Sequence, residues 1–306
     1  MDSVRVHAPA TVSNVVCGFD CLGFSLSAPY DEITVRRCVE PVIRISHNDN
    51  FGLPTEPSKN VVGVALRAML DVIDADFGFE VEITKYIKPG SGIGSSSASS
   101  CGAVVAANHL LGERFSKLEL AEFAMEGEKL ASGARHADNV APCIFGGFTL
   151  VRSTLPLDIV SIDFPPLLAT VIHPQIEIKT ADARAVLPKQ IALADAIKQW
   201  SNLASLVAAL SKGDLDLLAR SMEDLIVEPV RKRLIPKFNE VKEASIAAGA
   251  LGGGISGSGP SMFMLSDSSL IAESVGSAMD SVYAQTSIEF NIYVSEITTD
   301  GVKIVG

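Results

Sequence analysis

A loop of glycine and serine that runs directly into a helix of small residues limits most strongly what this chain can fold into. Residues 89–97 read PGSGIGSSS, and residues 98–112 continue as ASSCGAVVAANHLLG. The second stretch carries small and aliphatic residues at helical spacing, which predicts a buried helix. Glycine lets backbone N–H groups approach a ligand closely, and a helix start offers unpaired N–H donors and the positive end of the helix dipole. The loop is therefore a predicted phosphate site, with a serine-capped glycine turn as the alternative.

The remaining segments predict a mixed fold. Before the loop, period-two alternation predicts strands and one helical pattern interrupts them. Those elements are strands at 3–8, 30–37, 41–46 and 79–87 and a helix at 60–73. After the loop we expect a helix at 117–132, an irregular polar loop at 132–142 and a strand at 143–153.

A second arrangement begins near Pro156, which Pro165 and Pro166 follow. We expect strands at 167–175, 176–180, 261–265 and 288–297, and helices at 191–213, 215–226, 238–250 and 270–284. The chain is thus predicted to have two domains, residues 1–155 and 156–306. Neither half shows a regular βαβ rhythm, which favours the α+β class over a doubly wound sheet.

Composition excludes several classes of partner. Hydrophobic residues make up 47% and charged residues 20% of the 306 residues, a balance typical of globular domains. The formal net charge is −11 and no run of Lys and Arg of useful length is present, so we expect no nucleic acid partner. No stretch approaches the roughly 18 apolar residues of a membrane span, so we expect no membrane partner.

The N-terminus and the cysteines favour a cytoplasmic protein. The first ten residues alternate polar and apolar side chains like a strand, without the pattern of a secretion signal. The five cysteines are odd in number and lack C-x-x-C spacing, which suits a reducing compartment. Cys17 and Cys21 have no matching second pair, which favours reduced thiols over a metal site.

Two familiar nucleotide motifs do not fit. No Lys follows a suitable glycine run, so the Walker A pattern is absent. The pattern G-x-G-x-x-G occurs at Gly252, Gly254 and Gly257, but a predicted helix precedes it and a predicted strand follows, the reverse of a dinucleotide-binding unit. Pro260 would also obstruct a following helix. We expect this cluster to be a tight loop whose backbone approaches a ligand or another loop.

Three segments together resemble the motifs of the GHMP kinases, named after galactokinase, homoserine kinase, mevalonate kinase and phosphomevalonate kinase. Residues 89–100 are similar to the family's P-x-x-x-G-L-G-S-S-A motif, with Ile93 in place of Leu. Residues 6–26 resemble its first motif and residues 251–265 its third. The resemblance implies an ATP-dependent small-molecule kinase with a ribosomal-protein-S5-type N-terminal half, a ferredoxin-like C-terminal half and an active site between them.

The resemblance also implies where ATP and Mg²⁺ bind. In the family the glycine loop contacts the phosphates, and single polar residues flank the adenine and ribose. The corresponding residues are Asn60, Lys88, Pro89, Gly90, Ser91, Gly92, Ile93, Gly94, Ser95 and Ser96. Ser96 and Glu128 would hold Mg²⁺, which prefers a few hard oxygen ligands completed by phosphates and water. The alternative for Glu128 is a solvated position on its helix.

The polar loop indicates the acceptor. Residues 127–142, GEKLASGARHADNVAP, closely resemble the segment found in GHMP kinases that phosphorylate L-homoserine. That substrate is a zwitterion, so its site needs a cation for the carboxylate and an anion for the ammonium. By this resemblance the substrate site would contain Asn14, Asp20, Asp138, Thr180, Arg184 and Arg231. The alternatives are turn positions for the first two and surface ion pairs for the arginines.

Asn139 stands where mevalonate kinases carry an aspartate as proposed base, and homoserine kinases resemble this chain in carrying an amide. Phosphoryl transfer through a loose transition state needs little prior deprotonation of the nucleophile. We therefore expect Asn139 to orient the hydroxyl, with Glu128, Arg184 and Ser96 completing the catalytic set. His136 is either a general base or a surface residue that supports the site.

Two other functions stay open. A GHMP kinase for mevalonate or a sugar should carry an acid where Asn139 stands. A non-catalytic GHMP-fold sensor would not need Glu128, Ser96 and Asn139 together. The family resemblance also suggests a homodimer.

Overall fold

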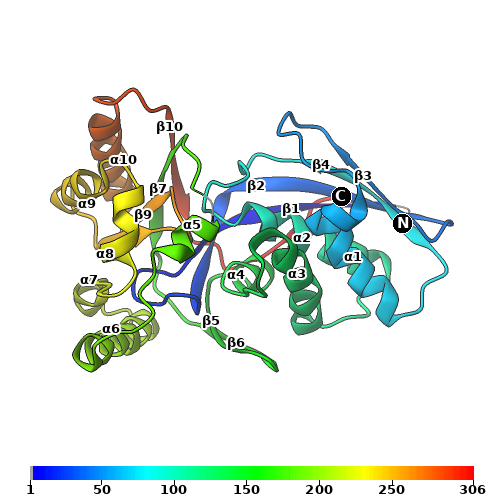
Figure 1. Cartoon of the computed structure of the whole chain (residues 1–306), viewed down its shortest axis with the longest axis horizontal. Helices are drawn as coiled ribbons and strands as arrows, with labels where there is room; N and C mark the ends of the chain where they lie inside the picture. The colour runs from blue at the N-terminus through cyan, green and yellow to red at the C-terminus, as the bar shows by residue number, and fades with distance from the viewer. Residues whose placement is uncertain (1–2, 179) are drawn as a thin grey trace.

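The computed structural model describes residues 3–178 and 180–306, without the side chains of residues 180 and 181. Its strands form a seven-stranded and a four-stranded sheet, each with helices packed against it (Figure 1). This mixture of separate sheets and helices confirms the α+β class. Within the described ranges, no helix is long and apolar enough to cross a membrane.

The larger sheet is built mainly from the N-terminal half. Its strands follow the order β11-β1-β2-β4-β3, with β5 paired to β2 and β6 paired to β5. Their bounds are β1 Ser3–Ser13, β2 Leu22–Cys38, β3 Ile43–His47, β4 Gly78–Thr84, β5 Phe148–Thr154, β6 Leu157–Ile162 and β11 Lys303–Ile304. The predicted division between residues 155 and 156 falls inside the β5–β6 hairpin, whose two strands both belong to this sheet.

Alternation along the strands gives this sheet its buried face. Val4 and Val6 of β1 are buried, and the intervening Arg5 is exposed. Val81 and Ile83 of β4 are buried, and Glu82 points to solvent. The apolar side chains face the helices α1 Val61–Val72, α2 Ser95–Leu110, α3 Lys117–Ser132 and α4 Val140–Phe145.

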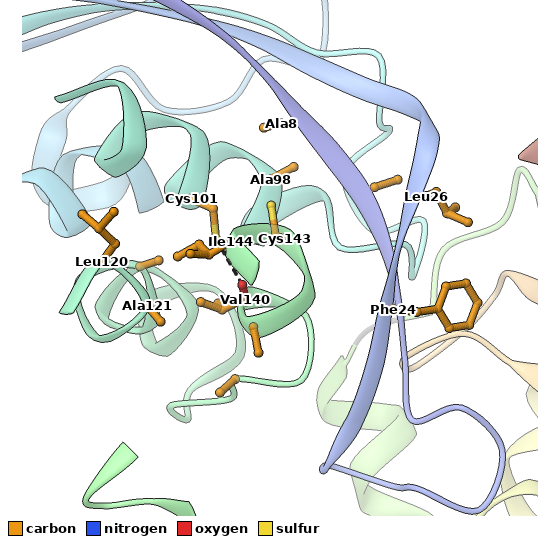
Figure 2. Close-up of a cluster of buried hydrophobic side chains, with 14 of the residues drawn as sticks. Ala8, Phe24, Leu26, Ala98, Cys101, Leu120, Ala121, Val140, Cys143 and Ile144 are labelled. Carbon is orange, nitrogen blue, oxygen red and sulfur yellow. Dashed lines mark hydrogen bonds between the residues drawn. The ribbon is translucent and has the colours of Figure 1, made fainter. Parts of the chain in front are cut away.

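Helix α2 is the buried centre of this helical layer. It packs against β1, β2, α1, α3 and α4, and most of its side chains are fully enclosed. Figure 2 shows Ala98 and Cys101 of α2 facing Val140 and Cys143 of α4 inside the core. The predicted buried helix is therefore confirmed. The starts of α2 and α4 both rest on this packed core.

The smaller sheet has the order β10-β7-β9-β8 with every pairing antiparallel. Its strands are β7 Leu168–Pro174, β8 Gly252–Ile255, β9 Met262–Ser266 and β10 Phe290–Glu296. Numbered along the chain this is the order 4-1-3-2 of a ferredoxin-like fold, as predicted. Helices α9 Phe238–Ala247 and α10 Ser269–Tyr283 pack against it.

The connection from β7 to α9 carries the remaining helices. They are α5 Thr180–Ala185, α6 Leu193–Lys212, α7 Leu215–Ser221 and α8 Glu228–Arg231. Two short 3₁₀ turns, Pro57–Lys59 and Lys232–Leu234, complete the described elements. The sheets meet where Leu26 of β2 bridges Ile297, and Phe24 packs edge-on against Phe263 of β9.

Some predicted elements are wrong. Residues 143–153 begin as the last turn of α4, and the strand starts only at Phe148. Residues 176–178 form no strand, α5 starts at Thr180, and residue 179 lies outside the described ranges. The helix predicted at 215–226 ends at Ser221, because Asp224 accepts backbone N–H groups of residues 226–228 and forms a tight turn instead.

Candidate functional site

A cavity of about 570 Å³, a size usual for small-molecule sites, is lined by both halves of the chain. The N-terminal half contributes the β1–β2 connection, the glycine loop, α3 and the polar loop before α4. The C-terminal half contributes α5, α8 and the loop after β8. Segments far apart in sequence thus converge on one cavity.

The glycine loop presents an open helix start to this cavity. Gly90, Gly92 and Gly94 all have positive φ, between 72° and 82°, a conformation that glycine adopts without strain. Gly94 is the N-cap of α2, and within the described ranges no side chain caps that end. Gly94, Ser95 and Ser96 line the cavity, so the N–H groups of the first turn remain suited to an anion. The serine-capped turn is therefore not what the structure adopts.

The glycine cluster that follows β8 packs against the glycine loop before α2 and supports it. Ser256 Oγ donates to the carbonyl of Gly92 over 2.7 Å, and Ser261 Oγ donates to the carbonyl of Ser91 over 2.6 Å. A Cβ on Gly92 would lie 2.6 Å from the carbonyl oxygen of Gly259, so the two loops are in direct contact. The expected approach of this loop to another loop is confirmed.

Glu128 is a buried carboxylate at the cavity wall. Only 6% of the residue is exposed, its Oε1 has no hydrogen-bond partner among the described residues, and burial raises its pKa. The nearby hydroxyls of Ser96 and Ser97 oppose that shift. An unsatisfied buried carboxylate beside a serine hydroxyl fits a hard cation that takes its other ligands from phosphates and water. Among the described residues, no group of three or more acidic, His or Cys side chains is placed to hold a metal ion by itself.

Asn139 lines the cavity beside the start of α2. Its Oδ1 accepts from Thr11 Oγ1 over 2.8 Å, and its Nδ2 donates to Ser13 Oγ over 2.9 Å. Both hydroxyls belong to the end of β1, so the amide is held by the sheet. A Cβ on Gly94 would lie 3.2 Å from Asn139 Oδ1, which places the amide beside the start of α2. Each amide atom can still make one further hydrogen bond, to a ligand.

Asp20, Arg184 and His136 form a charged cluster in the cavity wall. Arg184 Nη2 donates to Asp20 Oδ1 over 2.9 Å and lies 2.9 Å from His136 Nε2. A guanidinium has no acceptor atom, so His136 accepts through Nε2, is neutral and carries its proton on Nδ1. Burial and Arg184 lower the pKa of His136, against the opposing charge of Asp20. In this arrangement Arg184 occupies the acceptor nitrogen of His136.

Arg231 is almost fully buried, yet its guanidinium lines the cavity. Its Nε donates to the carbonyl of Ala183 over 2.9 Å, and its Nη1 donates to the carbonyl of Gly257 over 3.1 Å. Phe19, which the sequence did not single out, places its ring 5.0 Å from Arg231 Cζ and 5.8 Å from Arg184 Cζ. The ring fixes both cations against one wall. The only sequence signal for it was its position beside Asp20 in the first motif.

Asp138 is a buried acid beside the same cluster. Burial raises its pKa to about 7, the nearby charges of Asp20 and Glu128 add to the shift, and a hydrogen bond with Ser13 opposes it. The group is therefore poised to ionise fully only when a cation enters. A ligand ammonium would satisfy this requirement.

Several predicted residues lie outside the cavity lining. Asn60 caps α1 by accepting from Val62 N over 2.9 Å and donates to the carbonyl of Pro54, and Lys88 Nζ donates to Gln175 Oε1 over 2.7 Å. Both side chains bind other groups of the chain, and their predicted contacts with the nucleotide remain predictions. Ser91 and Ile93 are buried within the loop, and the Thr180 side chain is outside the described part of the chain.

Asn14 has φ 73° and lines the cavity, but its amide serves the backbone. It donates to the carbonyl of Gly257 over 2.7 Å and accepts from Asp20 N over 3.0 Å. It therefore joins the first motif to the third and aims Asp20 at the cavity.

Comparisons with known proteins agree with this geometry. Residues 60–147 match the model of the GHMP kinases N terminal domain, and residues 206–285 match that of the GHMP kinases C terminal region. A homoserine kinase of Chloroherpeton thalassium is 43% identical over 319 residues, covering 100% of both chains. A homoserine kinase of Pyrococcus furiosus is 37% identical over 296 residues, covering 96% of this chain and 98% of the relative.

Solved structures give the same result. The crystal structure of homoserine kinase from Cytophaga hutchinsonii has a TM-score of 0.96 and 48% identity, covering 100% of this chain and 98% of the other. L. major mevalonate kinase, in complex with R-mevalonate, has a TM-score of 0.73 at 18% identity, covering 96% and 95%, and supports the fold alone. Both family models and the full-length relatives therefore place this chain among the ATP-dependent GHMP kinases, in the homoserine kinase family.

Proposed function

We propose that the chain transfers the γ-phosphoryl group of Mg-ATP to the hydroxyl of L-homoserine, forming O-phospho-L-homoserine for threonine biosynthesis. One observation carries the proposal: an uncapped helix start, with Asn139 beside it, shares one cavity with a cluster of two arginines and two carboxylates. The first feature suits a triphosphate and the second suits a zwitterion. The fixed amide of Asn139 beside the helix start suits a hydroxyl held in line with the phosphate.

Each charged group has a separate role in this reaction. Arg184 and Arg231 would bind the acceptor carboxylate, and Asp20 and Asp138 would bind its ammonium. Asn139 would orient the hydroxyl through the hydrogen bonds that its amide has left. Glu128 and Ser96 would hold Mg²⁺, which neutralises phosphate charge when bound. The positive start of α2 would add to that neutralisation.

No side chain in this arrangement is needed as a strong base. His136 is neutral, but its acceptor nitrogen is occupied by Arg184, and Asn139 cannot take a proton at neutral pH. A loose transition state needs little deprotonation in advance, so the hydroxyl proton can leave with the transferred phosphoryl group's oxygens. Positioning and electrostatic stabilisation then supply most of the rate enhancement.

A coupled ADP-release assay with homoserine, mevalonate and galactose tests the acceptor. We expect turnover with homoserine and background rates with the other two, because those two lack the ammonium and carboxylate pair that this cavity is charged to receive. Efficient turnover of mevalonate or galactose would overturn the acceptor. Binding of homoserine and ATP analogue without any turnover would replace the kinase by a sensor.

The setting of the enzyme is part of the proposal. All five cysteines are free thiols, which supports a reducing, cytoplasmic environment. The net charge of −11 argues against a nucleic acid partner. A homodimer remains a prediction from the family resemblance, to be measured by sedimentation.

A further inference from the structure

Lys85 and Asp31 form a buried ion pair that joins the two ends of the glycine loop. Neither residue has a role in the reaction proposed above. Lys85 Nζ contacts Asp31 Oδ2, and the side chains of Lys85 and Asp31 are only 1% and 0% exposed. Asp31 lies on β2, and Lys85 directly follows β4. Burying two charges in this way carries a large desolvation cost before their attraction is counted, so the pair is not a neutral filler of the core.

The carboxylate of Asp31 holds the chain as it enters the loop. Its Oδ1 accepts the backbone N–H groups of Tyr86 over 2.8 Å and Ile87 over 2.9 Å. Burial raises the pKa of Asp31, while Lys85 and these two N–H groups oppose the shift. Residues 86 and 87 lie just before Lys88 and the loop, so Asp31 fixes the segment that leads into the loop.

The ammonium of Lys85 holds the helix that leaves the loop. It donates to the carbonyl of Ser95 over 3.0 Å and to Ser99 Oγ over 2.8 Å, in addition to Asp31. Ser95 Oγ in turn donates to the carbonyl of Ile87 over 2.8 Å, which closes the ring between the two ends. An ammonium has three protons, and all three are used here. Lys85 borders the cavity but has no proton left for a phosphate.

We propose that Lys85 and Asp31 are positioning residues for the nucleotide: together they fix both ends of the glycine loop, so that the first turn of α2 keeps the geometry that binds the triphosphate. This inference rests on the proposed use of ATP. It predicts an effect on nucleotide affinity and none on the acceptor, because neither residue touches the groups around Asp20 and Arg184.

The test uses Lys85→Met, Asp31→Asn and the double variant Asp31→Leu/Lys85→Met, with Lys198→Met as the control. Lys198 pairs with Glu223 over 2.9 Å on the surface, where 54% of its side chain is exposed. Nucleotide affinity is measured directly by calorimetry with ADP, and KM is measured for ATP and homoserine. Each single variant should weaken ADP binding and raise the KM for ATP by roughly 10- to 100-fold, with the KM for homoserine within about twofold. The control should match the unmodified protein.

The double variant separates positioning from folding. It removes both charges, so it should recover part of the melting temperature that a lone buried charge lowers in each single variant, although Tyr86 and Ile87 lose the acceptor of their N–H groups. Nucleotide binding should stay weak. If nucleotide binding recovers along with the melting temperature, the pair is merely structural. Tighter ADP binding by Asp31→Asn would mean that Lys85, once released, contacts the phosphates directly, and would also overturn the proposal. Absence of ADP binding to the unmodified protein would instead contradict the proposed function.

Discussion

At the scale of single residues, the site combines side chains whose types were predictable with contacts that were not. The sequence indicated Asp20, Arg184 and Arg231 through a family resemblance, and the structure brings them into one cavity. The sequence did not indicate that Phe19 lies against both arginines or that His136 accepts a hydrogen bond from Arg184. These contacts join residues more than 40 positions apart, and no local pattern encodes such a meeting.

Asp138 should make both stability and acceptor binding depend on pH. Its pKa is raised in the folded chain from 3.8 to about 7, so the folded state holds this proton more tightly than the unfolded state. The stabilisation is full below the unfolded pKa and is lost as pH rises through about 7. Asp138→Asn should therefore raise the free energy of unfolding by on the order of 2 kcal/mol at pH 8 and change it little at pH 4.

The same variant should lose homoserine binding, because an amide cannot pair with the ammonium. In the unmodified protein, the KM for homoserine should rise as pH falls below about 7, since the carboxylate becomes protonated. Denaturant titrations at the two pH values and a pH profile of KM check both effects. Equal stability changes at pH 4 and pH 8 would show that Asp138 does not titrate in this range.

Glu128→Gln should weaken the response to Mg²⁺. The change keeps the shape of a side chain that is only 6% exposed but removes the charge that a hard cation requires. Loss of a group that supports a metal ligand lowers metal affinity by roughly 10- to 100-fold. We expect the Mg²⁺ concentration for half-maximal turnover to rise by at least this factor. Glu122→Gln, at an exposed position of the same helix, is the control. An unchanged Mg²⁺ titration for Glu128→Gln would reassign the metal ligand.

At the scale of elements, the long periodic segments were predictable and the short ones near the site were not. Helix α2 follows from its small residues, and β1 follows from its alternation. Residues 176–178 alternate like a strand but form none, since β7 has already ended at Pro174. Helix α4 has only six residues and starts at the irregular loop that carries Asn139. Its stability comes from packing against α2, which a local pattern cannot report (Figure 2).

The start of α2 should tolerate no side chain at its N-cap. In Gly94→Ala the new Cβ would lie 2.0 Å from Thr11 Oγ1 and 3.2 Å from Asn139 Oδ1, so it would displace the pair that holds the amide. Gly112→Ala, just after the other end of this helix, is a matched control, because its φ is also positive at 75° and nothing lies within 4 Å.

Both changes should cost about 1–2 kcal/mol of backbone strain, because alanine disfavours the left-handed region. Only Gly94→Ala should also lower kcat/KM, by about 100-fold or more, since the groups around the reacting centre move. Melting curves and steady-state kinetics of the two variants give the comparison. Similar kinetics for both would show that the helix start and Asn139 are not coupled.

At the scale of the whole molecule, the α+β architecture was predicted from the family resemblance, and the closure of the two halves around the site was not. The order 4-1-3-2 of the smaller sheet agrees with the predicted ferredoxin-like half. The contacts that join the halves, such as Ser256 with Gly92 and Asn14 with Gly257, depend on hydroxyl and amide groups that occur equally well in ordinary turns. The site therefore exists only when both halves are folded and in contact.

Ligands that touch both halves should stabilise the whole chain. Binding at 100 times the dissociation constant adds about 2.7 kcal/mol, which should raise the melting temperature by about 5 °C or more. Arg231→Leu should abolish the increase caused by homoserine, because the buried guanidinium of α8 is lost, and should keep the increase caused by a non-hydrolysable ATP analogue. Arg220→Leu, an exposed change on α7, should keep both increases. Each shift is measured against the same variant without ligand, so differences in basal stability cancel. Loss of both shifts in Arg231→Leu would mean that this residue supports the whole site, and an undiminished homoserine shift would remove it from the carboxylate site.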